Sequence, residues 1–186
     1  MELERIIENY LPCNEQERED KRLMLKYIRE NGDVLSRANE TFHFTASAWV
    51  TDKSHRKILM LYHNIYNSWS WPGGHADGEE DLLSVALKEV KEETGIEKLR
   101  AVDENPLSLE ILTVNAHFKR GKYVAPHLHL NLTYLIEADE SDRLCVKEDE
   151  NSALKWFEMD ATVAASTEPD MRVVYEKLNR KLRELY

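Results

Sequence analysis

The stretch that decides the fold spans residues 74–96 and reads Gly74-His-Ala-Asp-Gly-Glu-Glu-Asp-Leu-Leu-Ser-Val-Ala-Leu-Lys-Glu-Val-Lys-Glu-Glu-Thr-Gly-Ile96. Its middle part places apolar residues at helical spacing, which predicts a helix from about Glu79 to Thr94. Asp77 is the expected N-cap of this helix, and Gly95 is a natural C-terminal stop. The sequence therefore places one amphipathic helix directly after a glycine-containing loop.

Three acids follow one face of this predicted helix. Glu89, Glu92 and Glu93 stand at positions i, i+3 and i+4, so their side chains meet along the edge of the apolar stripe. Like charges placed in this way repel, and partial burial increases the cost. A Mg²⁺ ion removes the conflict, because it takes carboxylate oxygens and leaves positions for water and phosphate. On spacing alone, a solvated acidic face partnered by Lys88 and Lys91 is the better-supported interpretation.

The residues around these acids resemble the Nudix box, which is Gly, five residues, Glu, seven residues and then Arg-Glu-apolar-x-Glu-Glu-x-Gly-apolar. The matching positions are Gly74, Glu80, Glu89, Val90, Glu92, Glu93, Gly95 and Ile96. One position departs from the pattern, since Lys88 stands where the family has arginine. Lysine offers a point charge in place of a two-pronged clamp, so we expect a larger effect on rate than on metal binding.

The resemblance implies roles by position. Glu92 and Glu93 would be ligands of Mg²⁺, with Mn²⁺ as the alternative ion, and the backbone carbonyl of Gly73 would join them. Glu89 would be either a further ligand or the general base that activates water. The structural residues of the box would be Gly74, Glu80, Lys88 and Gly95, with Glu80 as the partner of Lys88.

The same resemblance implies an α/β fold, the Nudix-type α/β/α sandwich with a mixed sheet. Residues 1–40 are expected to form an N-terminal helical extension, and residues 41–186 the Nudix hydrolase domain with its C-terminal helix. Strands are predicted, from period-two alternation and apolar runs, near 42–51, 57–63, 109–114, 128–136 and 153–157. The alternation predicts that the first of these is half-buried, with its polar residues facing solvent. Helices are predicted near 3–10, from a capping box at Asn14 to about residue 31, and over 170–185. Helical spacing places the following residues on the apolar side of the last helix: Val173, Val174, Leu178, Leu182 and Leu185.

Further site residues are predicted outside the helix. Glu150 is the candidate for an acidic loop residue that reaches the metal or the water, and a solvated charged turn is its alternative. His127 and His129 alternate with leucines and so share one strand face. They are expected to contact substrate phosphate or to bind a softer metal such as Mn²⁺ or Zn²⁺, and simple hydrogen bonding is the alternative.

Two other residues are predicted to bind substrate. His75 lies inside the box, close to the expected pocket mouth, and Trp71 could stack on a base, although core packing is the commoner role of such a side chain. The segments His43-Phe-Thr-Ala-Ser47 and Pro126-His-Leu-His-Leu130 are similar to those of a bacterial Nudix subgroup. That likeness does not choose among diphosphate substrates.

The composition of the chain limits the kinds of partner that it is expected to bind. The net charge is −10, so the chain lacks the surplus of Lys and Arg with which proteins bind long nucleic acid. A small phosphorylated substrate remains compatible, because a cation can bridge two acidic partners. No apolar run reaches about 18 residues and no secretory signal is recognised, so membrane insertion is not expected. Cys13 and Cys145 have no metal-ligand spacing, which favours reduced thiols and a cytoplasmic location.

The expected function is Mg²⁺-dependent hydrolysis of a phosphoanhydride bond in a nucleoside diphosphate linked to another moiety. The alternative is a module that binds or senses a nucleotide derivative with weak or no turnover, and Lys88 is the residue that favours it. Dimers are common in the family, so a homodimer is one expected state, and the sequence leaves the oligomeric state open.

Overall fold

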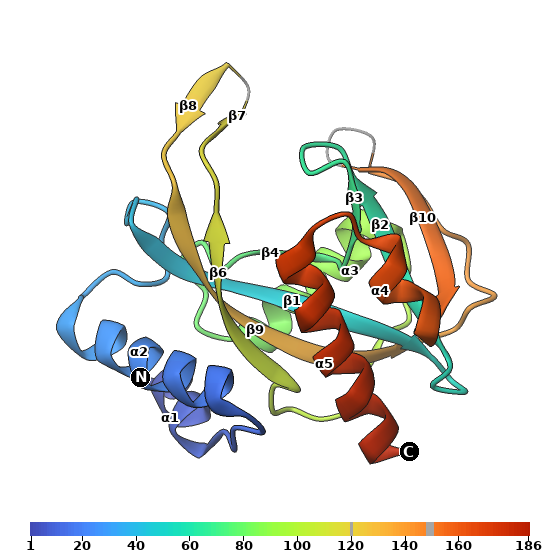
Figure 1. Ribbon diagram of the computed structural model, residues 1–186, viewed down its shortest axis with the longest axis horizontal. Coiled ribbons are helices and arrows are strands. Elements are labelled where there is room, and N and C mark those ends of the chain that lie inside the picture. The colour runs from blue at the N-terminus through green and yellow to red at the C-terminus, as the bar shows by residue number, and fades with distance from the viewer. Residues whose placement is uncertain (120, 148–150) are drawn as a thin grey trace.

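The computed structural model describes residues 1–119, 121–147 and 151–186 and is organised around one mixed sheet (Figure 1). The strands are β1 (Phe42–Asp52), β2 (Lys57–His63), β3 (Ser68–Ser70), β4 (Gly73–His75), β5 (Arg100–Ala101), β6 (Ser108–Val114), β7 (His117–Lys119), β8 (Lys122–Val124), β9 (His127–Ala138) and β10 (Asn151–Glu158). The helices are α1 (Glu2–Asn9), α2 (Glu15–Glu30), α3 (Leu82–Thr94), α4 (Thr162–Ala165) and α5 (Pro169–Leu185), with a short 3₁₀ turn at Met159–Ala161.

The centre of the sheet is the parallel pair of β1 and β9, which stay in register from Phe42 beside Leu128 to Asp52 beside Ala138. The other edge of β1 is divided between two strands. Its first half pairs with β4 and its last residues pair with β2, both antiparallel. This division brings the glycine loop that precedes the box into the middle of the sheet.

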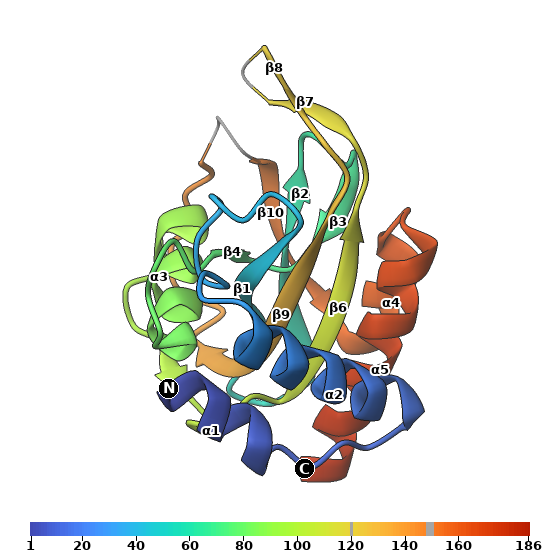
Figure 2. The same ribbon diagram turned by 90° about the vertical axis from the view of Figure 1, so that its left-hand side faces the viewer.

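Helices cover the sheet on two sides (Figure 2). Phe44, Ala46 and Ala48 point to one face, where they share a core with Val85 and Val90 of α3. Residues of β1 in between point to the opposite face, where Trp49 stacks on Tyr175 of α5 with ring centroids 5.1 Å apart. The predicted α/β/α sandwich with a mixed sheet is therefore confirmed.

The predicted half-burial of β1 is wrong, because both of its faces are buried. His43, Thr45 and Ser47, the polar residues of the alternation, are each 4% exposed. Sequence alternation indicated a solvated face, but the face is covered, and α5 packs on it at Trp49. Buried polar groups must be hydrogen-bonded, so this face carries a side-chain network.

The N-terminal helices pack on the sheet. Leu3, Ile7 and Met24 belong to the same core as β1, and the predicted cap is observed, since Asn14 Oδ1 accepts a 2.8 Å hydrogen bond from the Glu17 N–H. The division of the chain at residue 40 stays a prediction. None of the helices in the described residues combines the length and the apolar character needed to cross a bilayer.

Three details of the sequence prediction are wrong. The box helix begins at Leu82 with Asp81 as its cap, whereas Asp77 has a φ of 48° and pairs with Arg37. The segment before the box was predicted to be a loop, but it contains the strands β3 and β4. On α5 the apolar face was assigned by helical spacing alone, and Val173 is 68% exposed. Lys177 and Lys181 of the same helix are instead buried.

Candidate functional site

Two glutamates of α3 lie against the glycine pair of β4. Glu93 is 4% exposed, and its Oε2 accepts a 2.9 Å hydrogen bond from the backbone N–H of Gly73. Glu89 is half-buried, and its carboxylate occupies the space beside Gly74, where an added Cβ would lie 2.5 Å from the carboxyl carbon. The absence of a side chain at Gly74 is thus what lets this carboxylate approach the strand.

The backbone of Gly73 is directed away from β1. The even-numbered residues Pro72 and Ala76 hydrogen-bond with β1, through Ala48 N–H to Pro72 O at 2.9 Å and Ala76 N–H to Phe44 O at 3.0 Å. In an antiparallel pair, every second residue of a strand hydrogen-bonds to the partner strand. Gly73 lies between two such residues, so its N–H and C=O point away from β1. The N–H meets Glu93 there, and the carbonyl oxygen leaves the strand in the same direction.

Glu92 lies on the exposed side of α3 between two lysines. Lys88 Nζ is 3.7 Å from one of its carboxylate oxygens, and Lys147 Nζ is 3.9 Å from the other. We predicted Glu80 as the partner of Lys88, but in the described residues the recorded ion pair of Lys88 is with Glu92. Glu80 is exposed before the first turn of the helix. Exposed ion pairs of this kind contribute about 0–1 kcal/mol, so they compete weakly with a divalent cation.

Together these groups form a hard oxygen donor set. Three carboxylates and one outward-directed carbonyl suit Mg²⁺ or Mn²⁺, which prefer oxygen ligands. The glycine Gly95 ends the helix in the left-handed region, with φ of 75°, and its N–H donates to Lys91 O at 2.9 Å. This turn stops α3 one residue after the last pair of acids and fits the predicted framework position.

The predicted histidines come together on the opposite face of β4, with one more that the sequence analysis did not assign. Gly74 faces α3, so its neighbour His75 faces the other way. His129 and His127 lie there on β9, with Nε2 atoms 3.2 Å apart. The added residue is His43, whose ring centroid lies 5.2 Å from that of His75 and 5.1 Å from those of His127 and His129.

The surroundings of two of these rings, His129 and His43, favour the neutral form. Burial, together with the nearby histidines His75, His43 and His127, lowers the pKa of His129 to about 2. Burial also lowers the pKa of His43. Neutral imidazoles keep one bare nitrogen each, which is the form that binds metal or accepts a hydrogen bond.

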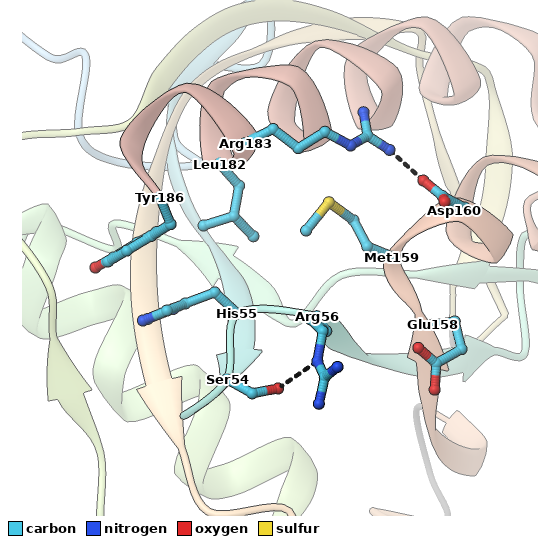
Figure 3. A pocket seen from close by; sticks show the side chains of 9 residues that line it. All are labelled: Ser54, His55, Arg56, Glu158, Met159, Asp160, Leu182, Arg183 and Tyr186. Carbon is cyan, nitrogen blue, oxygen red and sulfur yellow. Dashed lines mark hydrogen bonds and ion pairs between the residues drawn. The ribbon is translucent and has the colours of Figure 1, made fainter.

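Other predicted residues lie elsewhere. Trp71 is 8% exposed and packs edge-on against Tyr175, with centroids 5.4 Å apart, so the structure gives it a core position and its substrate role stays a prediction. Glu150 lies outside the described residues. A surface hollow of about 420 Å³ between the β1–β2 turn and α5 includes His55 and Tyr186 (Figure 3). It lies past the far end of β1 from His43, roughly 30 Å away at 3.3 Å per strand residue, and contains none of the predicted site residues.

A comparison with known families decides the identity. The family model described as NUDIX domain matches residues 41–178. The chain belongs to the Nudix family. The predicted family resemblance is therefore confirmed.

Relatives of this Nudix protein differ in what they act on. The m7GpppN-mRNA hydrolase NUDT17 of Xenopus laevis is 36% identical over 108 residues, which cover 55% of this chain and 34% of that protein. A probable DHNTP pyrophosphohydrolase of Lactococcus lactis subsp. cremoris (strain MG1363) is 26% identical over 131 residues, covering 67% of this chain and 74% of the relative. The chain thus spans only about a third of the length of the first of these relatives.

Solved structures share the fold of this Nudix protein. A binary complex of an Ap4A hydrolase from C. elegans aligns with a TM-score of 0.57 at 23% identity, covering 76% of this chain and 98% of that one. A NUDIX-family hydrolase from Clostridium perfringens aligns with a TM-score of 0.53 at 21% identity, covering 77% and 98%. At these identities the likeness establishes the architecture alone.

Proposed function

We propose that this Nudix protein is a pyrophosphohydrolase that uses Mg²⁺ to cleave a phosphoanhydride bond in a nucleoside diphosphate linked to another moiety. The observation that carries the proposal is the packing of Glu89 and Glu93 against the side-chain-free backbone of Gly73 and Gly74. Two carboxylates held this close to one strand repel each other, and a divalent cation offsets that repulsion. Relatives named as hydrolases of nucleotide derivatives support the reaction class.

The donor set fits a hard cation. Glu89, Glu92, Glu93 and the Gly73 carbonyl would hold Mg²⁺, with Mn²⁺ as the alternative ion. When bound, such an ion neutralises charge on the bridging phosphates and acidifies a water molecule. The general use of divalent cations in the family supports a metal and does not choose the ion.

The residues of the chain then have distinct tasks. The Gly73 N–H fixes the carboxylate of Glu93, which keeps it from swinging into solvent. Glu89 either completes the ligand set or accepts the proton of the attacking water, since a carboxylate within reach of that water can act as a general base. Lys88 and Lys147 hold Glu92 in place at the exposed rim until a cation binds.

The test is a panel of diphosphate compounds. Nucleotide sugars, dinucleoside polyphosphates, ADP-ribose and NADH would be incubated with the protein and Mg²⁺, Mn²⁺ or EDTA, and the phosphorylated products separated and quantified. We expect at least one compound to be cleaved with either ion and none with EDTA. Cleavage that persists in EDTA, or that occurs at another bond, would contradict the proposal.

A second candidate is a binding or sensing module, and Lys88 favours it because the family has arginine there. Tight binding of a nucleotide derivative by calorimetry, with no product in the panel, would support this candidate. The variant Lys88→Arg separates the two further. In an enzyme we expect equal or higher turnover, because a bidentate guanidinium orients carboxylates better than an ammonium group does. A large loss of turnover would mean that Lys88 has a role of its own.

A further inference from the structure

Four histidine rings meet on the face of the sheet opposite α3, at the ends of β1, β4 and β9. His43 stands beside His129 in the parallel β1–β9 register, and His75 on β4 stands beside Thr45 of β1. One ring nitrogen from each of His43, His75 and His129 lies within 4.8 Å of those from the other two. The three strands therefore bring three imidazoles to one point, although the residues are up to 86 positions apart.

We propose that His43, His75 and His129 form a second metal site, which binds a divalent transition-metal ion of the Zn²⁺ type. Neutral imidazole suits Zn²⁺ and similar ions, whereas Mg²⁺ prefers oxygen ligands. Zinc with bonds of about 2.0–2.1 Å places its ligand nitrogens roughly 3.4 Å apart, so small rotations of these rings would close the site. The site goes beyond the proposed hydrolase function, which rests on the carboxylates of α3.

The buried ring of His43 supplies an independent observation. Its Nδ1 lies 3.0 Å from the carbonyl oxygen of Asn39, and a carbonyl accepts only, so Nδ1 carries the proton. In the neutral ring, Nε2 is then unprotonated and presents a lone pair. That atom is buried and has no hydrogen-bond partner in the described residues, and the whole side chain is 4% exposed.

A buried ring nitrogen that has no hydrogen-bond partner destabilises the fold unless something binds it. A backbone carbonyl that fixes the tautomer of a histidine, and so aims its other nitrogen, is the usual outer contact of a metal ligand. His43 has this contact already. His127 has a similar backbone contact, because its Nδ1 lies 2.9 Å from Ala125 O. Its Nε2 lies 3.2 Å from Nε2 of His129. His127 therefore positions the ring of His129.

The site is separate from the carboxylates. Successive strand residues point to opposite faces, so Gly74 faces Glu89 while His75 faces the histidine cluster. Three protein ligands leave a fourth coordination position for water or an anion, as in zinc sites that stay open to ligands. Substitutions in one set should therefore leave metal binding by the other unchanged.

The first measurement is metal content. Protein without a histidine tag would be stripped with chelator, dialysed against Zn²⁺ in the presence of excess Mg²⁺, and analysed by mass spectrometry for metal per chain. We expect about one tightly bound Zn²⁺ in the wild type and in Glu93→Gln. Absence of bound Zn²⁺ in the wild type, or its complete displacement by Mg²⁺, would overturn the proposal.

The second measurement uses variants and Co²⁺ as a spectroscopic probe. We expect His75→Asn and His129→Asn to weaken Zn²⁺ binding at least about 100-fold and to abolish the visible absorption of tetrahedral Co²⁺, since removal of an outer contact alone costs 10–100-fold. The matched control is His63→Asn, a half-buried histidine of β2 outside the cluster, which should bind as the wild type does. Circular dichroism of the metal-free proteins checks folding. If His75→Asn is folded and retains the Co²⁺ spectrum, the site is wrong.

Discussion

At the scale of single residues, Glu93 combines burial with one backbone contact. Its carboxylate accepts the Gly73 N–H, and glutamine could accept the same bond through its amide oxygen. Glu93→Gln thus keeps the packing and removes the charge. This substitution therefore separates the effect of the charge from that of the packing at this position.

We expect Glu93→Gln to lower turnover at least about 100-fold, the usual effect of losing one major electrostatic group in an active site. Steady-state kinetics with Mg²⁺ on the best panel substrate provides the measurement. Glu97→Gln, an exposed acid just past the helix, is the control and should retain the wild-type rate. Wild-type kinetics in Glu93→Gln would remove this residue from the site.

The glycine at position 74 is explained by the carboxylate of Glu89, which lies against it. A Cβ there would lie 2.5 Å from the Glu89 carboxyl carbon, which is the far end of a flexible side chain. Gly74→Ala should therefore fold but displace that carboxylate. Since a misplacement of about 1 Å can cost ~100-fold in rate, we expect turnover to fall at least about tenfold with little change in melting temperature. Gly32→Ala, where a Cβ meets nothing within 4 Å, is the control. A drop in stability that matches the drop in rate would contradict this explanation.

At the scale of elements, α2 protects an open sheet edge. β6 pairs with β9 on one side only in the described residues, and exposed edges invite association with other chains. Side chains of α2 satisfy the free backbone groups instead. Asp20 accepts the Ile111 N–H at 2.9 Å, and Gln16 donates to Leu109 O at 3.1 Å.

Asp20→Ala should leave the Ile111 N–H without its acceptor and destabilise the protein by about 1–3 kcal/mol. Urea unfolding measures the change. Glu19→Ala, an exposed acid on the same helix that pairs with Arg22, should cost about 1 kcal/mol or less. Equal stability of the two variants would mean that the edge contact contributes nothing.

At the scale of the whole molecule, buried charges join the N-terminal helices to α5. Lys181 Nζ lies 2.5 Å from Glu17 Oε1, and Lys177 Nζ lies 2.8 Å from Glu110 Oε1. Glu110 in turn accepts from Asn131 Nδ2 at 3.3 Å. These side chains are at most 11% exposed, so removal of one charge leaves its partner desolvated.

The network continues to the box. Asn131 Oδ1 accepts from Thr45 and from Ser47, each at 2.9 Å. Ser47 pairs with Gly73 of β4, where its hydroxyl would lie 2.6 Å from a Cβ added to that glycine. A chain of polar contacts thus runs from the N-terminal helices to the strand that presents Gly73 and His75.

Glu17 makes this network sensitive to acid. Burial alone would raise its pKa, but the Cys13 N–H, Lys181 and Lys177 outweigh burial and lower the pKa to about 2. Because the folded value lies below the unfolded value, the stabilisation is complete above about pH 4.5 and is lost as the pH falls toward 2. Tyr10, Glu110 and both lysines face the same carboxylate.

Glu17→Gln should therefore cost about 3–5 kcal/mol at neutral pH, the usual effect of breaking a buried ion pair. The difference from wild type should shrink as the pH falls from about 5 toward 2. Unfolding free energies from urea titrations across that range measure it. Glu15→Gln, an exposed acid on the same helix, is the control and should follow the wild type. A constant difference between Glu17→Gln and wild type would contradict the shifted pKa.

The sequence by itself determined the box, the sandwich, the helix that carries Glu89, Glu92 and Glu93, and the positions of the long strands β1, β2, β6, β9 and β10. These features depend on local spacing, because a helix or a strand repeats its side-chain direction within a few residues. The helix start was missed by three residues, since Asp77 and Asp81 both resemble caps and only tertiary contacts with Arg37 distinguish them.

Only the tertiary structure decided which distant residues meet. The β1–β9 register brings His43 beside His129, and the packing of α5 brings Lys177 and Lys181 to Glu17. Neither pairing leaves a signal in local periodicity, because register and packing angle are set by the burial of whole faces at once. The buried polar face was missed for the same reason: a pattern of alternation shows that two faces differ and does not show what covers each of them.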